Sequence, residues 1–487
     1  MSRVRRNGPI VMKFGGTSVA DGKRMAQAAT IVERQLRRRP VVVVSALAGV
    51  TDMLLDVASI APHGDLRRVE RRIEALRQRH RSVAQALIRS TSRRQSTLKA
   101  LDDKLAELSN VCYGVLLLRE LSQRSRDLIS SFGERLSARL LAAALQERGT
   151  PSTYVDARRM VVTSEHHGAA RVDFPETNPR VRRALRPLLA RRRVPVVTGF
   201  IGATRGGVTT TLGRSGSDYT ASLIGAALRA EEIQIWKEVD GVCTADPSLI
   251  RDARVVPHLS YREAAEISHF GAEVVHPQTM LPAMREGIAI RIKNTFRPDA
   301  PGTVITSRAR PGTPLILSSI DNMALVTVEG TGFIGTPGTI LRVLQIVGNE
   351  GINIYMISMA SSEYNLSFLI QRSDTARAVA ALERELRYER EVEGTIRNIS
   401  VEAPMAVVAV VGSQMKGKIG VSGRVFGALG EGGVNVVAIA QGSSEYNISV
   451  VVRSRDMKRA LQVIHEGLHL RELKRASSAR ARVEARA

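Results

Sequence analysis

The sequence is poor in residues on which several classes of protein depend. Only two of its 487 residues are cysteine, Cys112 and Cys243, too few for a disulfide framework or a cysteine-ligated zinc site. No apolar run approaches the ~18 residues of a membrane-spanning helix, and the N-terminus lacks the apolar core of a signal peptide. We therefore expect a protein of the reducing cytoplasm without a membrane partner.

Aromatic residues and lysine are also scarce, and both bear on the net charge of +24. Of the 71 basic residues 10 are lysine and 61 are arginine, a bias that fits a codon preference better than a binding device. The arginines crowd only in 67–94 and in the basic tail 471–487, which we expect to be disordered. With 4% aromatic residues, few rings could stack on bases. We therefore expect solvated arginine faces and no nucleic-acid partner.

The first part of the chain alternates short β-branched runs with helical stretches, which is typical of an α/β domain. The runs at 9–14 and 40–46 are continuously apolar, as in a sheet buried on both faces, and a helix is predicted between them at Lys23–Arg38. Further strands are predicted at 194–200, 232–239 and 289–295. A charge-rich helical insertion or lid is predicted at 65–125, and the Pro/Gly-rich stretch 296–303 predicts a domain boundary.

The rest of the chain contains an internal repeat. Residues 351–367 and 433–449 align without a gap at an offset of 82, and nine of the 17 positions are identical. Each copy predicts strand, helix, strand, Ser-Ser-Glu hairpin, strand and closing helix (374–386 and 456–466), the order of a small α+β sandwich. Taken alone, the repeat fits either dimerisation modules without a ligand or a pair of small-molecule sensors.

Four polar clusters stand beside predicted strand ends. They contain Lys13, Gly15 and Gly16; Ser45 and Thr51; Glu134; and Arg214, Ser217 and Asp218. Taken singly they have ordinary explanations, since Glu134 fits a helix N-terminal charge and Ser217 or Asp218 a helix cap. The first cluster, however, combines a lysine with a glycine turn whose backbone N–H groups are exposed, and such a combination is suited to binding phosphate. Because open α/β sheets bind ligands where their strands end, we expect one shared site.

Together these stretches resemble aspartate kinase, in the amino-acid-kinase family. The matching motifs are KFGGTSV, FGERLSARLL, TTTLGRSGSDYTA, EVDGVCTADP and FGAEVVHPQTMLPA, and the repeat resembles the family's ACT regulatory domains. The resemblance implies a three-layer α/β/α kinase domain at 8–297, and a linker with the first regulatory strand at 298–322. It also implies ferredoxin-like ACT domains at 323–400 and 401–470. The repeated region is most similar to the regulatory half of bifunctional aspartate kinase–homoserine dehydrogenases. We expect no dehydrogenase segment.

The resemblance implies transfer of the γ-phosphoryl group of ATP, with Mg²⁺, to the side-chain carboxylate of L-aspartate, giving 4-phospho-L-aspartate. That carboxylate is already ionised at neutral pH, so catalysis has to position two anions and neutralise their repulsion. In this scheme Lys13 neutralises the transferred group and Asp218 orients Lys13. The amides of Gly15 and Gly16 would hold phosphate oxygens.

For the acceptor, the resemblance implies that Arg214 binds the α-carboxylate and Glu134 the α-ammonium group. Ser45, Thr51 and Ser217 would complete the aspartate pocket. Two alternatives stay open: another activity of the family, on glutamate, acetylglutamate or a nucleoside monophosphate, and a non-catalytic amino-acid sensor.

The expected ATP site departs from the commonest family pattern. Lys237 and Glu238 stand where many members have Thr-Asp. Cys243, Ser248 and Glu273 stand where those members have tyrosine, arginine and lysine. Because a lysine appears at 237 as one is lost at 273, we infer a charge exchange in a site that includes Lys237, Glu238 and Asp246.

The regulatory half implies feedback by an end-product amino acid of lysine, threonine and methionine biosynthesis. Asn353 and Asn435 occupy equivalent places in the two copies, and Gln441 precedes the second Ser-Ser-Glu where the first copy has Met359. Threonine-sensitive relatives have glutamine there in each copy. We therefore expect threonine before lysine as the effector, the second copy as the better site, and a homodimer or homotetramer.

Overall fold

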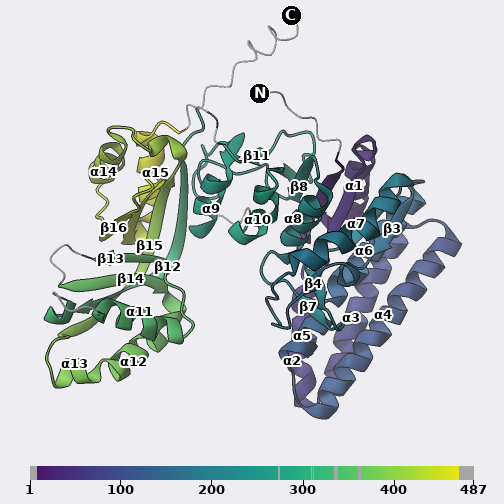
Figure 1. Cartoon of the computed structure of the whole chain (residues 1–487), viewed down its shortest axis with the longest axis horizontal. Coiled ribbons are helices and arrows are strands. Elements are labelled where there is room, and N and C mark those ends of the chain that lie inside the picture. Colours follow the sequence, from purple (N-terminus) through teal and green to yellow (C-terminus); the bar gives the residue numbers. More distant parts are fainter. Residues whose placement is uncertain are drawn as a thin grey trace, which may run out of the picture. The chain divides into compact units, whose positions relative to one another are not determined.

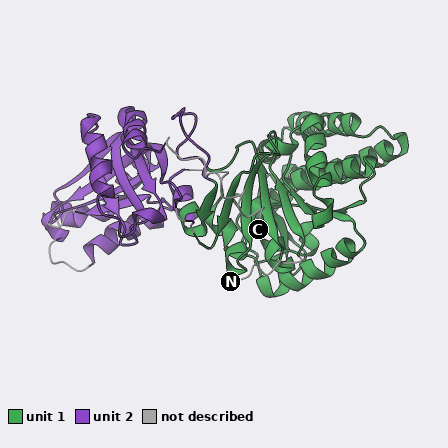
Figure 2. Ribbon diagram, turned by 90° about the horizontal axis from the view of Figure 1, so that it is seen from above, with its two compact units in different colours: residues 1–242, 257–264, 274–309 green, residues 243–256, 265–273, 310–487 purple. Residues whose placement is uncertain are grey.

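The computed structural model describes residues 8–271, 275–308, 310, 312–333, 338–359 and 364–470. It contains two compact units, which Figure 2 draws in different colours. Unit 1 comprises residues 1–242, 257–264 and 274–309, and unit 2 comprises residues 243–256, 265–273 and 310–487. Three parts of the sequence predictions lie outside the described residues: the basic tail, Glu273 and the first Ser-Ser-Glu.

Unit 1 is built on an eight-stranded sheet with the order β3-β5-β2-β1-β8-β10-β11-β9. Its strands are β1 (Ile10–Phe14), β2 (Val41–Val44), β3 (Ser152–Val155), β5 (Val194–Thr198), β8 (Glu232–Lys237), β9 (His258–Ser260), β10 (Ala289–Asn294) and β11 (Thr303–Thr306). From β3 to β10 all neighbours are parallel, whereas β11 is antiparallel to β10. Every residue of β1, β2 and β5 is buried, and for β1 and β2 this confirms the prediction from their continuous apolar runs.

Helices surround this sheet (Figure 2). They are α1 (Gly22–Glu33), α2 (Val50–Ile60), α3 (Leu66–Leu87), α4 (Thr91–Leu118), α5 (Gln123–Ser130), α6 (Phe132–Glu147), α7 (Phe174–Ala190), α8 (Gly216–Leu228), α10 (Pro277–Arg285) and the first turn of α9 (Tyr261–His269), whose residues from 265 on belong to unit 2. The helix predicted at Lys23–Arg38 ends early, at Glu33. A short 3₁₀ turn, Leu36–Arg38, follows it and ends at Arg39, which takes a left-handed conformation (φ 53°).

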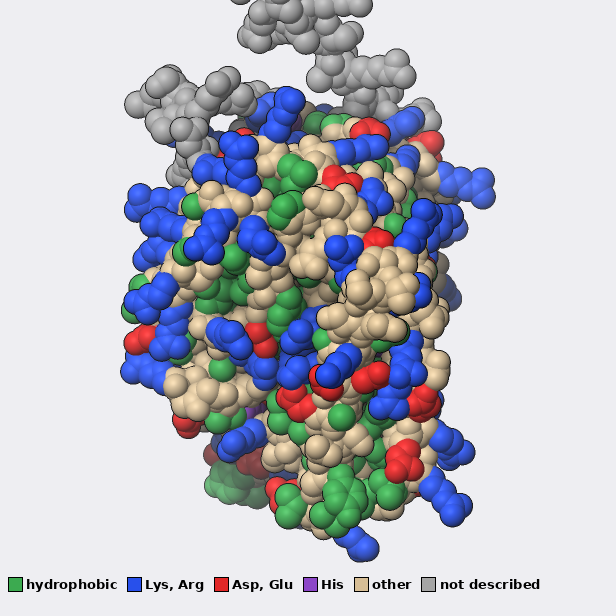
Figure 3. Space-filling model, turned by 90° about the vertical axis from the view of Figure 1, so that its right-hand side faces the viewer, with side chains coloured by type: hydrophobic (Ala, Val, Ile, Leu, Met, Phe, Trp, Pro, Cys, Tyr) green, Lys and Arg blue, Asp and Glu red, His purple; other side chains and the backbone are tan. Residues whose placement is uncertain are grey.

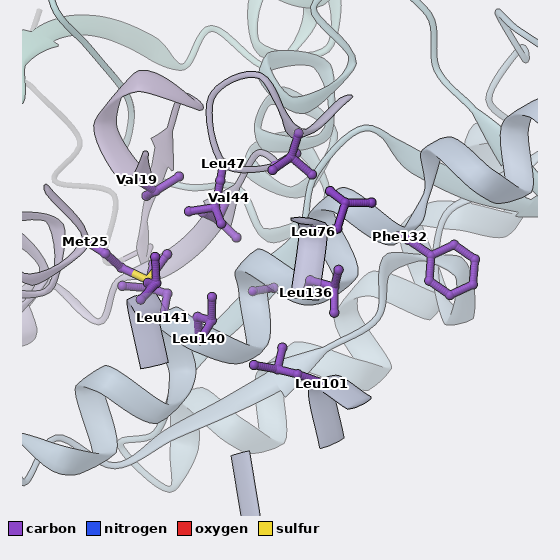
Figure 4. Close-up of a cluster of buried hydrophobic side chains, with 14 of the residues drawn as sticks. Val19, Met25, Val44, Leu47, Leu76, Leu101, Phe132, Leu136, Leu140 and Leu141 are labelled. Carbon is purple, nitrogen blue, oxygen red and sulfur yellow. The ribbon is translucent and has the colours of Figure 1, made fainter. Parts of the chain in front are cut away.

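The predicted insertion at 65–125 is confirmed as helical, and α3 and α4 pack against each other as a hairpin (Figure 1). Figure 4 shows Leu76 of α3 and Leu101 of α4 in one buried cluster with Leu136 of α6 and Val44 of β2. All four side chains are fully buried. The hairpin therefore belongs to the core of unit 1 and is not a lid lying on its surface.

Charged side chains are dispersed on the face drawn in Figure 3, where Lys and Arg alternate with Asp, Glu and apolar side chains. Several arginines of the hairpin are paired, as in the contact of 2.8 Å between Arg81 of α3 and Asp102 of α4. Exposed pairs of this kind contribute little to stability. Within the described ranges, no helix combines the length and apolarity needed to cross a membrane.

A small second sheet of unit 1 leads towards the polar loop at 213–218. Its strands are β4 (Val162–Thr163), β6 (Ile201–Thr204) and β7 (Thr209–Thr211), in the order β4-β6-β7. β6 and β7 form an antiparallel hairpin, and the chain passes from β7 through Gly213 into α8. The left-handed conformation of Gly213 (φ 75°) makes this sharp turn possible.

Unit 2 contains one six-stranded antiparallel sheet with the order β13-β14-β12-β15-β17-β16. Its strands are β12 (Ile316–Glu329), β13 (Met356–Met359), β14 (Asn365–Gln371), β15 (Asn398–Val411), β16 (Ala438–Gln441) and β17 (Asn447–Arg453). Its helices are α11 (Thr339–Asn349), α12 (Thr375–Glu385), α13 (Arg387–Glu391), α14 (Val421–Glu431) and α15 (Met457–Gly467). This order confirms the predicted repeat, including both closing helices, α12 and α15.

The compact units divide the chain differently from the expected domain boundaries. Unit 1 reaches residue 309 because β11 pairs with β10 and so extends the eight-stranded sheet. β12 runs through the expected boundary at 322 and pairs with β15 on both sides of it, so the two repeats share one sheet. Residues 243–256 belong to unit 2, where Ala245 and Ile250 join the buried cluster of the second repeat.

Candidate active site

A cavity of about 560 Å³ lies in unit 1 where β1 and β2 end. It is lined by Lys13, Gly16, Ser45, Ala46, Leu47, Ala48, Gly49, Thr51, Asp52, Glu134, Gly168, Phe200, Gly213, Arg214, Ser215, Gly216 and Ser217. All four polar clusters of the sequence analysis contribute to this lining. Because the parallel strands of the sheet end at one edge, segments far apart in the sequence meet there.

Lys13 is held in the cavity by a buried ion pair. Its Nζ lies 2.6 Å from Oδ1 of Asp218, and the two side chains are 8% and 4% exposed. The N-cap of α8 is Ser215, so the alternative that Asp218 is a plain helix cap is wrong. Lys237, at the end of β8, places its Nζ 3.9 Å from the other carboxylate oxygen. Asp218 thus contacts two lysines, and a buried carboxylate in this position is stabilised by their charge.

The two glycines of the turn after β1 have different surroundings. The amide of Gly15 donates a hydrogen bond of 3.2 Å to the carbonyl of Trp236, so the prediction that this amide binds phosphate is corrected. Gly16 does line the cavity. A Cβ atom on Gly16 would lie 2.9 Å from the carbonyl oxygen of Ala46, too close for any other residue without a shift. Glycine there lets the two cavity loops approach each other.

Glu134 presents a buried carboxylate to the cavity. It lies in the first turn of α6 and is 4% exposed, and one oxygen accepts a hydrogen bond of 3.1 Å from the amide of Ala46. Its other oxygen has no hydrogen-bond partner among the described residues. Burial raises the pKa of Glu134 to about 7, against the opposing effects of the Ala46 amide and of the Lys13 charge. Glu134 is thus a charge in the first turn of a helix, as the alternative held, but its buried and unpartnered oxygen also makes the cavity suit a cationic group.

Arg214, Ser217, Ser45 and Thr51 line the same cavity. Ser217 packs tightly, since a Cβ atom on Gly199 would lie 2.6 Å from its side chain. The charge of Arg214 also reaches His276, whose pKa is lowered by burial first and by Arg214 second. The motif around this histidine is part of the family resemblance, but the sequence assigns the histidine no role.

The remaining predicted residues lie outside the cavity lining. The carbonyl of Glu238 accepts a hydrogen bond of 3.2 Å from the side chain of Asn294. Asp246 belongs to unit 2, where its Oδ1 accepts bonds of 2.8 and 2.7 Å from the amide and hydroxyl of Ser248. Ser248, which has no evident role in the sequence, therefore braces Asp246. The predicted regulatory residues Asn353, Asn435 and Gln441 are exposed side chains of unit 2, Gln441 at the end of β16.

Comparison with known proteins identifies the family. The family model described as "Amino acid kinase family" matches residues 8–294. The chain belongs to the amino acid kinase family. A second family model, "ACT domain", matches residues 326–386 and 408–468, so the kinase fold is followed by tandem ACT domains, as the resemblance implied.

Relatives within the amino acid kinase family are aspartokinases. The chain is 35% identical over 471 residues to "Aspartokinase 1, chloroplastic" of Arabidopsis thaliana, covering 94% of this chain and 79% of that protein. It is 35% identical over 468 residues to "Bifunctional aspartokinase/homoserine dehydrogenase 1, chloroplastic" of the same plant, covering 94% of this chain. The chain spans about half the length of such bifunctional relatives, 51% in this case.

Solved structures of aspartokinases have the same fold. E. coli aspartokinase III in complex with aspartate and ADP is 29% identical, with a TM-score of 0.78 over 95% of this chain and 100% of that chain. The same enzyme in complex with lysine and aspartate is 30% identical, with a TM-score of 0.77 over 94% of this chain and 99% of that chain.

Proposed function

We propose that this chain is an aspartate kinase, which transfers the γ-phosphoryl group of MgATP to the β-carboxylate of L-aspartate and releases ADP and 4-phospho-L-aspartate. The observation that carries the proposal is the convergence of Lys13, Glu134 and Arg214 on one cavity. The unpartnered oxygen of Glu134 suits the α-ammonium group of an amino acid, and the guanidinium of Arg214 suits its α-carboxylate. The aspartokinase relatives, one solved with aspartate and ADP, support the same assignment.

The reaction needs positioning and charge neutralisation more than proton transfer. The acceptor carboxylate, an aspartate side chain with an ordinary pKa of ~3.9, is ionised at neutral pH and attacks phosphorus directly, while the bond from phosphorus to the ADP oxygen breaks. Two anions have to approach each other, and Lys13 supplies the positive charge between them. Asp218 pairs with Lys13 at 2.6 Å, so we assign it the role of orienting that amine. Ser45, Thr51 and Ser217 complete the acceptor pocket.

MgATP enters this scheme as the second substrate. The described residues include no group of three or more His, Cys, Asp or Glu side chains that could hold a metal ion. We propose that Mg²⁺ is bound mainly by phosphate oxygens and water, as is common for this ion. Within unit 1, Gly16, Lys237 and Glu238 are the residues we assign to the nucleotide. The 3.9 Å approach of Lys237 to Asp218 supports a second cation beside the transferred group.

The ACT repeats are the proposed regulatory sites. E. coli aspartokinase III has been solved with lysine, which supports an amino-acid effector for this fold. Gln441 in the second repeat stands where the first repeat has Met359, and this glutamine favours threonine over lysine. We further propose feedback on the first step of lysine, threonine and methionine biosynthesis, a homodimer or homotetramer formed through the repeat sheets, and a cytoplasmic location.

An ATP-dependent hydroxamate assay tests substrate, chemistry and regulation together. With hydroxylamine as the trap, we expect a hydroxamate from L-aspartate and none from L-glutamate or N-acetylglutamate. Activity on a nucleoside monophosphate is followed instead by release of ADP, and we expect none. Threonine and lysine are then added separately. If another acceptor is phosphorylated, the chain has a different activity of the family. If amino acids bind but none is phosphorylated, the chain is a non-catalytic amino-acid sensor.

A further inference from the structure

One buried carboxylate that the proposed reaction does not use holds two parts of the cavity wall. This carboxylate is Asp127, in α5, whose side chain is 4% exposed. The wall parts are Gly168 and the stretch 213–217, both of which line the cavity. Neither Asp127 nor Gly168 belongs to a recognisable sequence motif, and α5 itself has no side chain in the cavity lining.

Both oxygens of Asp127 are hydrogen-bonded to these two segments. Oδ1 accepts from the Thr211 hydroxyl at 2.6 Å and from the Gly168 amide at 3.1 Å. Oδ2 accepts from the Thr211 amide at 3.2 Å and from the Gly168 amide at 3.1 Å. Nδ1 of His167 lies 2.9 Å from the same oxygen. Asp127 therefore joins α5, the loop around Gly168 and the end of β7.

These bonds fix the segments that carry the proposed acceptor contacts. Thr211 ends β7, and Gly213 and Arg214 follow it within three residues. A Cβ atom on Gly213 would lie 3.2 Å from Cβ of Ala169, so the two segments are also packed closely. On the other side, α5 leads through a single residue into α6, whose first turn contains Glu134. A shift of the Asp127 carboxylate would change the position of Arg214 relative to Glu134.

We propose that Asp127 is a positioning residue that sets the spacing between Arg214 and Glu134 and so matches the cavity to an α-amino acid. The inference rests on the proposed function, because it assigns the α-carboxylate to Arg214 and the α-ammonium group to Glu134. A carboxylate is required because the Thr211 hydroxyl and the amides of Thr211 and Gly168 all donate a hydrogen to it. A side-chain amide at this position would turn one acceptor into a donor that faces other donors.

Kinetics of Asp127→Asn and Thr211→Val test the proposal. We expect KM for aspartate to rise on the order of 10- to 100-fold, because displacements near 1 Å have effects of this size on substrate positioning. KM for ATP should stay within about twofold, since the nucleotide contacts are unchanged. Thr211→Val removes the hydroxyl and keeps the side-chain shape, and Thr211→Ser should restore the wild-type KM for aspartate because the hydroxyl returns.

Ser152→Ala is the matched control, since its buried hydroxyl donates a bond of 2.7 Å to the carbonyl of Ala142 and does not line the cavity. The positioning role is overturned if KM for both substrates changes in parallel, or if KM for aspartate does not move in either variant. If Asp127→Asn fails to fold, Thr211→Val decides alone. Calorimetry with L-aspartate separates the two failures: a wild-type chain that binds no aspartate overturns the proposed function with this inference, whereas equal affinity in wild type and variants overturns the positioning role only.

Discussion

At the residue scale, we expect the buried ion pair of Lys13 and Asp218 to have a large effect on stability. Because both side chains are less than a tenth exposed, removing one partner leaves an uncompensated charge in the interior. We expect Asp218→Ala to lower the free energy of unfolding by about 3–5 kcal/mol. The double variant Lys13→Met with Asp218→Leu should lose much less, as denaturant unfolding of both will measure. Equal losses in the single and double variants would mean that packing, and not charge, explains the effect.

Glu134 gives the acceptor site a predicted pH dependence. Its pKa of about 7 means that the carboxylate of the free protein becomes protonated as the pH falls below neutrality. Protonation removes the charge that attracts the α-ammonium group, so KM for aspartate should rise towards tenfold for each unit of pH below about 7. Steady-state kinetics at a series of pH values from about 5.5 to 8, which spans that pKa, measure the rise in KM.

Glu134→Gln provides the control for this pH dependence. The glutamine keeps the size of the side chain and the acceptor for the Ala46 amide, but it does not titrate. KM for aspartate should be raised in this variant and nearly constant with pH over the same interval. A wild-type KM that is equally constant would show that Glu134 stays ionised in the free protein and would contradict the prediction.

At the scale of elements, the sequence predicted the strands whose burial requires a continuous apolar run, but not the contacts between segments that are distant in the sequence. Apolar runs located β1 and β2, because strands buried on both faces need them. The occupied Gly15 amide could not be predicted, because its partner, the carbonyl of Trp236, arrives only through the pairing of β1 with β8. Asp127 was missed for the same reason. Its partners come from segments about 40 and 84 residues away, and a lone aspartate in a polar helix carries no signal.

In the α3–α4 hairpin, the buried His80 should make the stability of the fold sensitive to acid. This histidine is fully buried, and burial lowers its pKa from 6.5 to about 4. The unfolded chain therefore binds a proton at a higher pH than the folded chain does, so stability is complete above about 6.5 and is lost as the pH falls towards 4. The loss should amount to about 3 kcal/mol at most.

His80→Leu should reduce this acid sensitivity. Denaturant unfolding at neutral pH and near pH 5 measures the stability change, which should be smaller in the variant than in the wild type, because leucine does not titrate. The variant will lose the bond of 2.7 Å from the His80 ring to the carbonyl of Leu76, so the comparison is between the pH-dependent differences, not the absolute values. His63→Leu, at an exposed position, is the control. Parallel losses in all three proteins would contradict the role of His80.

At the scale of the whole molecule, the two compact units are not consecutive in the sequence. Residues 243–256 contribute Ala245 and Ile250 to the core of the second repeat, together with Leu461 and Ile464 of α15. The hydroxyl of Thr244 also lies 3.2 Å from Nε2 of the buried His465. No local pattern indicates this exchange, because residues 243–247 continue the motif EVDGVCTADP of the kinase family while the apolar side chains of the segment pack in unit 2.

This interleaving predicts that the kinase segment is not independent of the regulatory segment. A chain ended at residue 309 lacks α14 and α15, so Ala245 and Ile250 lose the core in which they are buried. We expect the shortened chain to be less stable and prone to aggregate, as thermal unfolding and size-exclusion chromatography will measure, because apolar surface is left exposed. In the full chain Ile250→Asp should produce part of the same loss, while Ile250→Val should be close to wild type. A shortened chain with the thermal midpoint of the full chain would mean that segment 243–256 repacks within unit 1 by itself.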